Sequence, residues 1–416
     1  MSVVATHQTG DRLGSYALFG AILASAGLPI YLFAPKFFAD SYGVSLATLG
    51  AVLFGLRLFD VVQDPLLGWV AERTTRIRGL TGILGGALLA ASMVALFAVA
   101  PPIAPILWFS LALIGLFSAF SFLSINFYAQ GVTKADEITG GHVRLAAWRE
   151  GGALLGVCIA AVLPTAFATL TNMPFTAFAY VYAAVVLLAV IAMMPEWRPS
   201  PVATEPTSIS EILGDNVARR LLILALVNAT PLAVSSTLFL FFVESRLVAP
   251  GWEGPLLVVF FVAAAASAPV WARIAQKIGT KRTLLIAMLL AIASFSGVFA
   301  LGPGDVVLFA VVCLATGATI GADLTLLPAM FSRRMAAISP SGAQGFGLWS
   351  LVTKFTLAFA AGVLLPALDL VGFQSGSANN PENVLQTLTW LYAGLPIALK
   401  FIAIALLVAI PLEENA

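Results

Sequence analysis

The sequence predicts an all-α polytopic membrane protein, with twelve transmembrane helices arranged as two six-helix bundles. Three observations predict this fold: the composition, the number of apolar runs and the placement of basic residues. Of the 416 residues, 60% are hydrophobic and only 10% are charged. A soluble domain has about 25% charged residues, so we expect most of this chain to lie within a membrane.

Twelve apolar runs follow one another, each near or above the length of about 20 residues that crosses a bilayer as a helix. They cover residues 15–38, 45–71, 80–100, 104–130, 145–170, 174–195, 218–243, 254–275, 281–301, 305–331, 342–370 and 384–411. The first run is longer than the apolar region of a signal peptide and lacks a basic segment with a small-residue cleavage site, so we expect a retained helix.

Basic residues are concentrated in alternate loops between these runs. They are Arg73, Arg76, Arg78, Lys134, Arg144, Arg198, Arg219, Arg220, Arg273, Lys277, Lys281, Arg282, Arg333 and Arg334. The other loops carry almost only Lys36 and Arg246. The positive-inside rule therefore predicts cytoplasmic termini in a bacterial-type inner (plasma) membrane. The net charge of +1 indicates no nucleic-acid partner, and we expect a monomer surrounded by the lipid bilayer.

The chain divides into two similar halves. A polar stretch rich in Pro, Ser and acidic residues predicts a cytoplasmic linker over residues 196–216, with a short surface helix from Ser210 to Gly214. It separates bundles at residues 1–195 and 217–416. A shift of 204 residues aligns DPLLGWVAERTTRIR with APVWARIAQKIGTKR, and Pro65 then falls on Pro269. A recurrence of two helices and a basic loop at the same place in each half is typical of parallel transporter repeats.

Two carboxylates lie inside one apolar run, AVLFGLRLFDVVQDPLLGWV. At 100° per residue, Arg57, Asp60 and Asp64 fall within about 60° of one another on the helix. A charge near the bilayer centre costs about 2.5–3.5 kcal/mol on insertion scales, which indicates a functional use. The shift of 204 places alanines, Ala264 and Ala268, at these positions, so the packing of the repeat does not need acids. The alternative is an internal ion pair between Arg57 and Asp60.

The stretch RLFDVVQDPLLGWVAERT resembles the signature of the glycoside–pentoside–hexuronide cation symporters, the melibiose-permease-like branch of the major facilitator superfamily. Four other stretches look like parts of the same family: YALFGAILASAGLPIYLFAPKFFADSYGVS, RLAAWREGGALLGVCIAAVLP, WARIAQKIGTKR and GAQGFGLWSLVTKFTLAFAAGVLLPALDLVGF. The resemblance spans most of the chain. It implies a secondary active transporter that works by alternating access.

The resemblance implies a coupling-cation site formed by Asp60, Asp64 and Ser121, with Lys354 approaching from the opposite bundle. The ion is Na⁺ or H⁺, and Gln63 would be a further oxygen ligand for Na⁺. Sugar-transporting members carry acids on helices 1 and 4, where this chain has Ala24 and Ser124. The expected function is cation-coupled symport of a small organic solute, with a sugar or glycoside among the candidates. The alternative cargo is a lysolipid or other amphipathic solute, as in lysolipid transporters of the same broad family.

Other polar residues are candidates for contact with substrate or coupling ion. Lys354 has no acid on its own helix before Asp369, so we expect its partner to be Asp60 or Asp64. Arg149 either snorkels to the interface or faces the substrate. The remaining candidates are Asp323 and Lys400, which have no obvious local partner, and the possible cavity-lining residues Ser124, Asn126, Tyr128, Trp349, Tyr31, Gln130 and Asn228.

The basic loops have the charge expected of conformational control in this superfamily. The residues assigned to this gating role are Glu72, Arg73, Arg78, Lys277 and Arg282. The small residues of GGALLG, at 151–156, predict close helix packing. Cys158 and Cys313 are expected to be packing residues, and no cofactor is expected. A membrane enzyme is the rival class, but no P-loop pattern and no long loop for a nucleotide occurs in the sequence.

Overall fold

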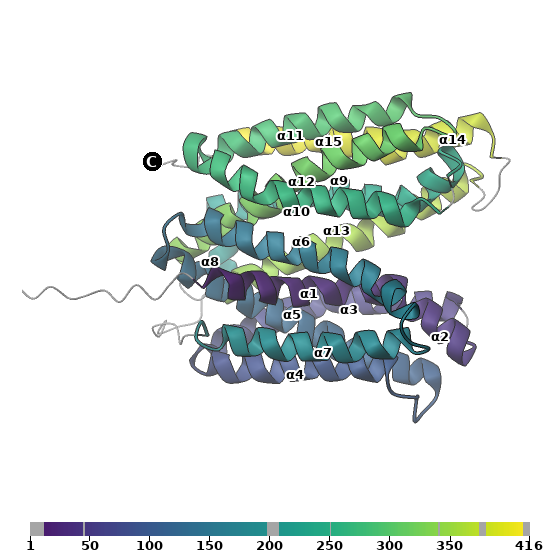
Figure 1. Ribbon diagram of the computed structural model, residues 1–416. Helices are drawn as coiled ribbons and strands as arrows, with labels where there is room; N and C mark the ends of the chain where they lie inside the picture. The colour runs from purple at the N-terminus through teal and green to yellow at the C-terminus, as the bar shows by residue number, and fades with distance from the viewer. Residues whose placement is uncertain are drawn as a thin grey trace, which may run out of the picture.

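The computed structural model describes residues 12–44, 46–197, 208–249, 251–339, 342–373 and 380–410, and these ranges contain helices and no strand. Figure 1 shows two layers of long helices, one from the first half of the chain and one from the second. The α-helices are α1 (Leu13–Leu32), α2 (Ala34–Tyr42), α3 (Leu46–Arg73), α4 (Arg78–Phe97), α5 (Pro105–Glu137), α6 (Gly141–Ala168), α7 (Pro174–Met193), α8 (Ile209–Gly214), α9 (Asn216–Phe241), α10 (Glu253–Ile278), α11 (Thr280–Ser296), α12 (Val306–Ile338), α13 (Ala343–Leu370), α14 (Glu382–Thr389) and α15 (Leu395–Ala409).

Nine helices in the described ranges are long and apolar enough to cross a membrane. Three further helices of 20 to 28 residues, α1, α3 and α13, lie among them. α1 packs along α6, and α3 packs along α13. Helix α3 is less apolar than the nine because it carries Arg57, Asp60 and Asp64 in one stretch.

One expected span is interrupted, and a proline lies just after the break. The run expected over 15–38 ends as α1 at Leu32, and α2 starts separately with Pro35 in its first turn. Proline has no N–H and is favoured in the first turn of a helix. The run expected over 384–411 is one continuous span, Glu382–Ala409, in which a π-turn from Trp390 to Gly394 joins α14 to α15.

Each half has its own apolar core. Helices α1 to α7 pack around aromatic side chains that include Phe19, Phe97 and Phe127. Helices of the second half surround two further clusters, one near Phe331 and one near Tyr392. The expected surface helix is present as α8, whose Ser208 cap accepts a hydrogen bond from the Glu211 N–H at 3.2 Å. Residues 198–207 of the expected linker lie outside the described ranges.

The GGALLG stretch brings α6 against α1, as predicted from its small residues. A methyl group added at Gly152 would lie 2.1 Å from the Ala17 carbonyl oxygen, and one at Gly156 would lie 2.4 Å from that of Ala21. Gly151, on the same helix, has nothing within 4 Å of such a group. The two backbones therefore touch at Gly152 and Gly156 but not at Gly151.

We expect Gly152→Ala to lower the free energy of unfolding by about 1–3 kcal/mol, because α1 and α6 must move apart to admit the methyl group. Gly151→Ala is the matched control, and it should be neutral or stabilising because alanine favours the helix by up to about 1 kcal/mol. Thermal denaturation of the two purified variants measures the difference. Equal midpoints would contradict the close packing.

The 204-residue repeat is visible in the packing. Adding 204 to the bounds of α3 gives 250–277, close to those of α10, and adding 204 to those of α6 gives 345–372, close to those of α13. α3 packs on α13, and α10 packs on α6, so these two contacts between the halves are repeats of each other. This is the arrangement expected for two similar halves related by an approximate twofold axis.

Basic residues gather at one end of the molecule, which we name the basic end. There Lys281 Nζ donates to the carbonyl oxygens of Val408 and Ile410 at 3.0 and 2.8 Å, and Arg220 donates to that of Ala409 at 2.8 Å. Arg334 forms an ion pair with Asp215. Helix α1 begins and α15 ends at this same end, near α8 (Figure 1). An even number of crossings is required for that arrangement.

Asp215 has two roles at the basic end. Its Oδ1 atom accepts a hydrogen bond from the Ala218 N–H at 2.7 Å and so caps α9. Its hydrogen bonds from Arg334 lower the pKa of the Asp215 carboxyl. Because folding lowers the pKa, the ionised Asp215 carboxylate stabilises the fold at pH values above the ordinary carboxyl pKa. This stabilisation is lost as the pH falls through the lowered pKa.

We expect Asp215→Ala to destabilise the protein by about 0.5–2 kcal/mol through loss of the helix cap. Asp215→Asn keeps a capping oxygen and removes only the charge, so its smaller effect should shrink when the pH falls below about 4. Denaturation midpoints at pH 7 and pH 3 give the comparison. A deficit in Asp215→Asn that does not change with pH would show that the ion pair is not its cause.

Candidate functional site

Asp60, Asp64 and Lys354 converge where α3 packs on α13. The Lys354 ammonium lies 2.9 Å from Asp64 Oδ2 and 3.6 Å from Asp60 Oδ2. Asp64 is fully buried and Asp60 is 1% exposed. The two acids come from the first half of the chain and the lysine from the second. The pairing of Lys354 with these acids, expected because its own helix has no acid before Asp369, is therefore present.

Two hydroxyl groups complete this cluster. Lys354 donates to Ser121 Oγ on α5 at 2.6 Å, and Ser350 Oγ donates to Asp64 Oδ2 at 2.6 Å. Ser350 was not predicted, although it lies one helical turn before Lys354 and so shares its face. The Arg57 side chain lies outside the described part of the structure. Asp60 nevertheless has a cation beside it, in Lys354.

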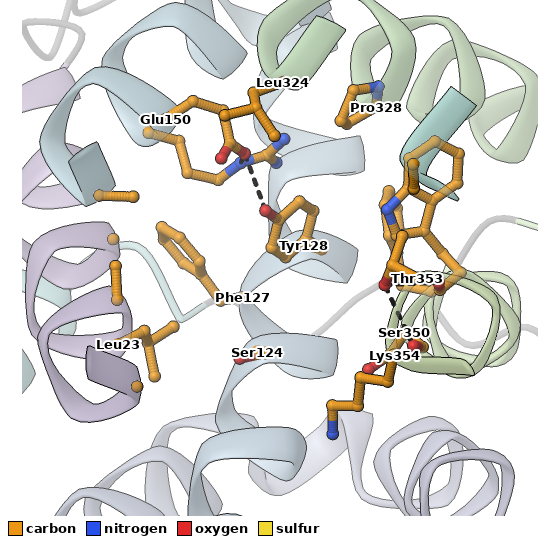
Figure 2. A pocket seen from close by; sticks show the side chains of 18 of the residues that line it. Leu23, Ser124, Phe127, Tyr128, Glu150, Leu324, Pro328, Ser350, Thr353 and Lys354 are labelled. Atoms are coloured by element: carbon orange, nitrogen blue, oxygen red, sulfur yellow. Dashed lines mark hydrogen bonds and ion pairs between the residues drawn. The ribbon is translucent and has the colours of Figure 1, made fainter. Parts of the chain in front are cut away.

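A cavity of about 450 Å³ lies between the two halves and reaches this cluster. Asp60 and Lys354 line one part of it, and most of its other walls are apolar. Figure 2 shows Leu23 and Phe127 on one side and Ser350, Thr353 and Lys354 on the other. Ala24 and Ser124 both line the cavity. The two positions at which sugar-transporting members carry acids are therefore an uncharged part of the wall.

Arg149 lies in the cavity wall, so the alternative that it snorkels to the interface is wrong. Its side chain is 3% exposed, and its Nε donates to Glu150 Oε1 at 2.8 Å. The guanidinium stacks 3.7 Å over the ring of Tyr128, whose hydroxyl also donates to Glu150 at 2.8 Å (Figure 2). Arg149 Nη2 has no hydrogen-bond partner among the described residues.

Asp323 and Lys400, expected to lack local partners, are partners of each other. Lys400 Nζ forms an ion pair with Asp323 Oδ2 and donates to Asn228 Oδ1 at 2.7 Å. The three residues come from α12, α15 and α9, and all are buried. Asp323 and Asn228 line the cavity. Asp323 and Lys400 are 77 positions apart in the sequence. Hydropathy alone does not predict that the helices carrying them meet.

Of the other predicted lining residues, Tyr128, Ser124, Trp349 and Asn228 line the cavity, whereas Asn126 and Gln130 do not, nor does Gln63, which was expected as a further Na⁺ ligand. Gln63 accepts a hydrogen bond from Ser118 Oγ at 2.7 Å. Asn126 donates to the Phe122 carbonyl of its own helix at 3.0 Å. Both side chains are buried behind the wall. The side chain of Tyr31 is outside the described part of the structure.

The residues assigned to gating all lie at the basic end, in different surroundings. Arg78 is buried and donates to Gln130 at 3.0 Å, whereas Arg73 is exposed and stacks 3.7 Å over Trp69. Glu72 is buried beside them, and Lys277 and Arg282 are exposed. Their control of conformation stays a prediction.

The helices that carry the charged cluster also touch closer to the basic end. A methyl group at Gly68 of α3 would lie 3.4 Å from the Cα of Gly347 on α13, and one at Gly347 would lie 3.1 Å from the Asp64 carbonyl oxygen. His142 lies in the first turn of α6, with its Nδ1 2.9 Å from Ser332 Oγ on α12. The two halves are therefore in contact on this side of the cluster.

A family model described as MFS/sugar transport protein matches residues 14–414. The chain belongs to this melibiose-permease-like family of the major facilitator superfamily. It is therefore an integral membrane protein and a transporter rather than an enzyme. The prediction from the α3 signature and the other quoted stretches is confirmed.

The human sodium-dependent lysophosphatidylcholine symporter 1 is similar over a shorter segment, with 24% identity over 167 residues. The match covers 38% of this chain and 31% of the human protein. Among solved structures, a bacterial homologue of the iron transporter ferroportin, outward-facing with soaked iron, has a TM-score of 0.68 at 14% identity, with 95% of this chain and 98% of that chain covered. The human organic anion transporter MFSD10 (TETRAN) has a TM-score of 0.65 at 17% identity, with 94% and 99% covered. These likenesses show the fold.

Proposed function

We propose that this transporter is a cation-coupled symporter of an amphipathic solute, working by alternating access. Twelve helices would span a bacterial-type inner membrane, in bundles at residues 1–195 and 217–416 joined by a linker at 196–216. The monomer would have both termini in the cytoplasm, since the basic residues gather at the end where α1 begins and α15 ends.

The observation that carries coupling is the position of the Lys354 ammonium between Asp60 and Asp64. Its positive charge stands where a coupling cation would be held. A cation that binds the two acids displaces the lysine, which belongs to the other half of the molecule. The ion pair between the halves then breaks, and the halves are freer to move against each other. Binding of the cation is thereby linked to the change of access.

Na⁺ is the coupling ion that we favour over H⁺. Na⁺ requires several oxygen ligands, and the carboxylates of Asp60 and Asp64 lie with the Ser121 hydroxyl around one point. The similarity to a sodium-dependent symporter points the same way. A proton would need only one of the two carboxylates.

The cavity wall favours an amphipathic cargo over a sugar. Leu23, Phe117, Phe120 and other apolar side chains form most of the wall, and polar groups are confined to a few positions. An apolar pocket with a few placed polar groups suits a ligand that has a polar head and an apolar body. The human relative is named for lysophosphatidylcholine, which has this shape.

The test is uptake by the purified protein in sealed proteoliposomes without ATP. We expect an inward Na⁺ gradient to drive accumulation of a labelled lysolipid above its equilibrium level, and a sugar such as melibiose not to accumulate. Accumulation driven only by a proton gradient would overturn Na⁺ coupling and keep symport. Accumulation of the sugar alone would overturn the amphipathic cargo, and no gradient-driven accumulation of either solute would overturn symport.

A further inference from the structure

The second half of the molecule contributes its own polar group to the cavity, in addition to the Asp60–Asp64–Lys354 cluster. Asp323 on α12 and Asn228 on α9 line the cavity, while Lys400 on α15, bound to both, does not. All three side chains are buried, with Asp323 only 6% exposed. The lysine therefore holds the two residues from behind and leaves them at the cavity wall.

One oxygen of Asp323 is left over by this arrangement. Lys400 is bound to Oδ2, and Oδ1 is buried with no hydrogen-bond partner among the described residues. An ionised carboxylate only accepts hydrogen bonds. An unmade hydrogen bond at a buried charged atom is costly. The free oxygen at the wall therefore indicates a bound group that donates a hydrogen bond.

The polar group belongs to the second half alone. The 204-residue shift relates Asn228 to Ala24 and Asp323 to Ala119. Ala24 lines the cavity from α1 as Asn228 does from α9. The repeat therefore tolerates alanine at both positions, and a role confined to helix packing does not require Asn228 or Asp323.

We propose that Asp323 and Asn228 form a cargo subsite that accepts a hydrogen bond from an N–H or O–H donor in the head group of an amphipathic solute. This rests on the proposed transport of an amphipathic solute and adds the chemistry of its head group. Lys400 is a positioning residue that fixes the Asp323 carboxylate. The structure gives the donor two sources, a primary ammonium or a hydroxyl.

Head groups that differ in their hydrogen-bond donors test the subsite. Lysophosphatidylethanolamine has a primary ammonium, whereas lysophosphatidylcholine has three N-methyl groups and no N–H; both are used with a methylated sn-2 oxygen, so that neither has a hydroxyl donor. A β-alkyl glucoside with the same chain length supplies hydroxyl donors. A charge-assisted hydrogen bond corresponds to about tenfold or more in affinity. We expect the wild-type protein to bind the ethanolamine lipid, the glucoside or both at least about tenfold more tightly than the choline lipid.

The variant is Asp323→Leu combined with Lys400→Met, which removes both charges and so leaves none unpaired. In this variant we expect the affinity for the ethanolamine lipid or the glucoside, divided by that for the choline lipid, to fall to about one. Thr325→Val is the matched control, because Thr325 is a buried polar residue of the same helix that does not line the cavity. It should keep the wild-type preference. Binding is measured in detergent by thermal shift and by competition with a labelled lipid, with no ion gradient imposed.

Each outcome has a distinct meaning. Loss of the preference for the ethanolamine lipid identifies an ammonium as the donor, and loss for the glucoside identifies a hydroxyl. Equal wild-type affinities, a preference that survives in the Asp323→Leu/Lys400→Met variant, or no binding of any probe would overturn the proposal. Because binding is measured without a gradient, failure of Na⁺-driven uptake overturns only the proposed coupling and leaves the head-group result standing.

Discussion

Asp64→Asn is expected to abolish uptake driven by a cation gradient. The Asp64 carboxylate is fully buried, and its two oxygens contact the Lys354 ammonium and the Ser350 hydroxyl. Without this charge, the site offers a cation only Asp60, which already faces Lys354 at 3.6 Å. Removing one partner of a buried pair costs about 3–5 kcal/mol, so a loss of this size in cation binding would lower the affinity by about two to four powers of ten.

The assay is lysolipid uptake into proteoliposomes with an imposed Na⁺ or H⁺ gradient. Glu211→Gln, in the exposed helix α8, is the matched control because it neutralises an acid far from the cavity. It should transport as the wild type does. Full uptake by Asp64→Asn would show that coupling takes place elsewhere, and Asp323 with Lys400 would then be the next place to examine.

A second substitution separates coupling from folding. Asp64→Asn leaves the Lys354 ammonium with one acid fewer in a buried site, so part of the defect would be loss of stability. Asp64→Asn combined with Lys354→Met removes the positive charge as well. This double variant should recover thermal stability without recovering accumulation against a gradient. Exchange of cargo down its gradient should persist, since the helices can still alternate.

The sequence was sufficient to predict the cluster because three constraints coincide there. Helical periodicity placed Asp60 and Asp64 on one face of α3, and distance from the basic loop gave their depth. Lys354 lies at a similar depth on α13 and lacks an acid on its own helix before Asp369. Electrostatics then required these charges to meet. In the structure, the Lys354 ammonium lies within 3.6 Å of both carboxylates.

The contacts of Arg149 and Lys400 could not be predicted from the sequence. Glu150 adjoins Arg149, but Tyr128 is on another helix, and nothing in a periodic pattern gives the rotation of α5 against α6. Asp323 and Lys400 were singled out as intramembrane charges, yet their pairing depends on how α12 and α15 cross. The break before Pro35 shows a different failure, since hydropathy measures apolar length and not backbone hydrogen bonding.

Lys400→Met is expected to destabilise the protein by about 3–5 kcal/mol, because it leaves the buried Asp323 carboxylate without its cation. Lys277→Met is the matched control, since Lys277 is exposed at the basic end and surface substitutions usually change stability by no more than about 0.5 kcal/mol. Denaturation midpoints of the purified proteins measure both effects.

The double variant, Asp323→Leu with Lys400→Met, should regain most of the lost stability, because apolar residues of similar volume often replace a buried ion pair without loss. Equal instability of the single and double variants would show that packing around Lys400, rather than its charge, is what the fold needs. Recovery of stability would instead show that the fold does not depend on the pair. The Asp323 carboxylate at the cavity wall would then be dispensable for folding, and its retention would point to the cargo.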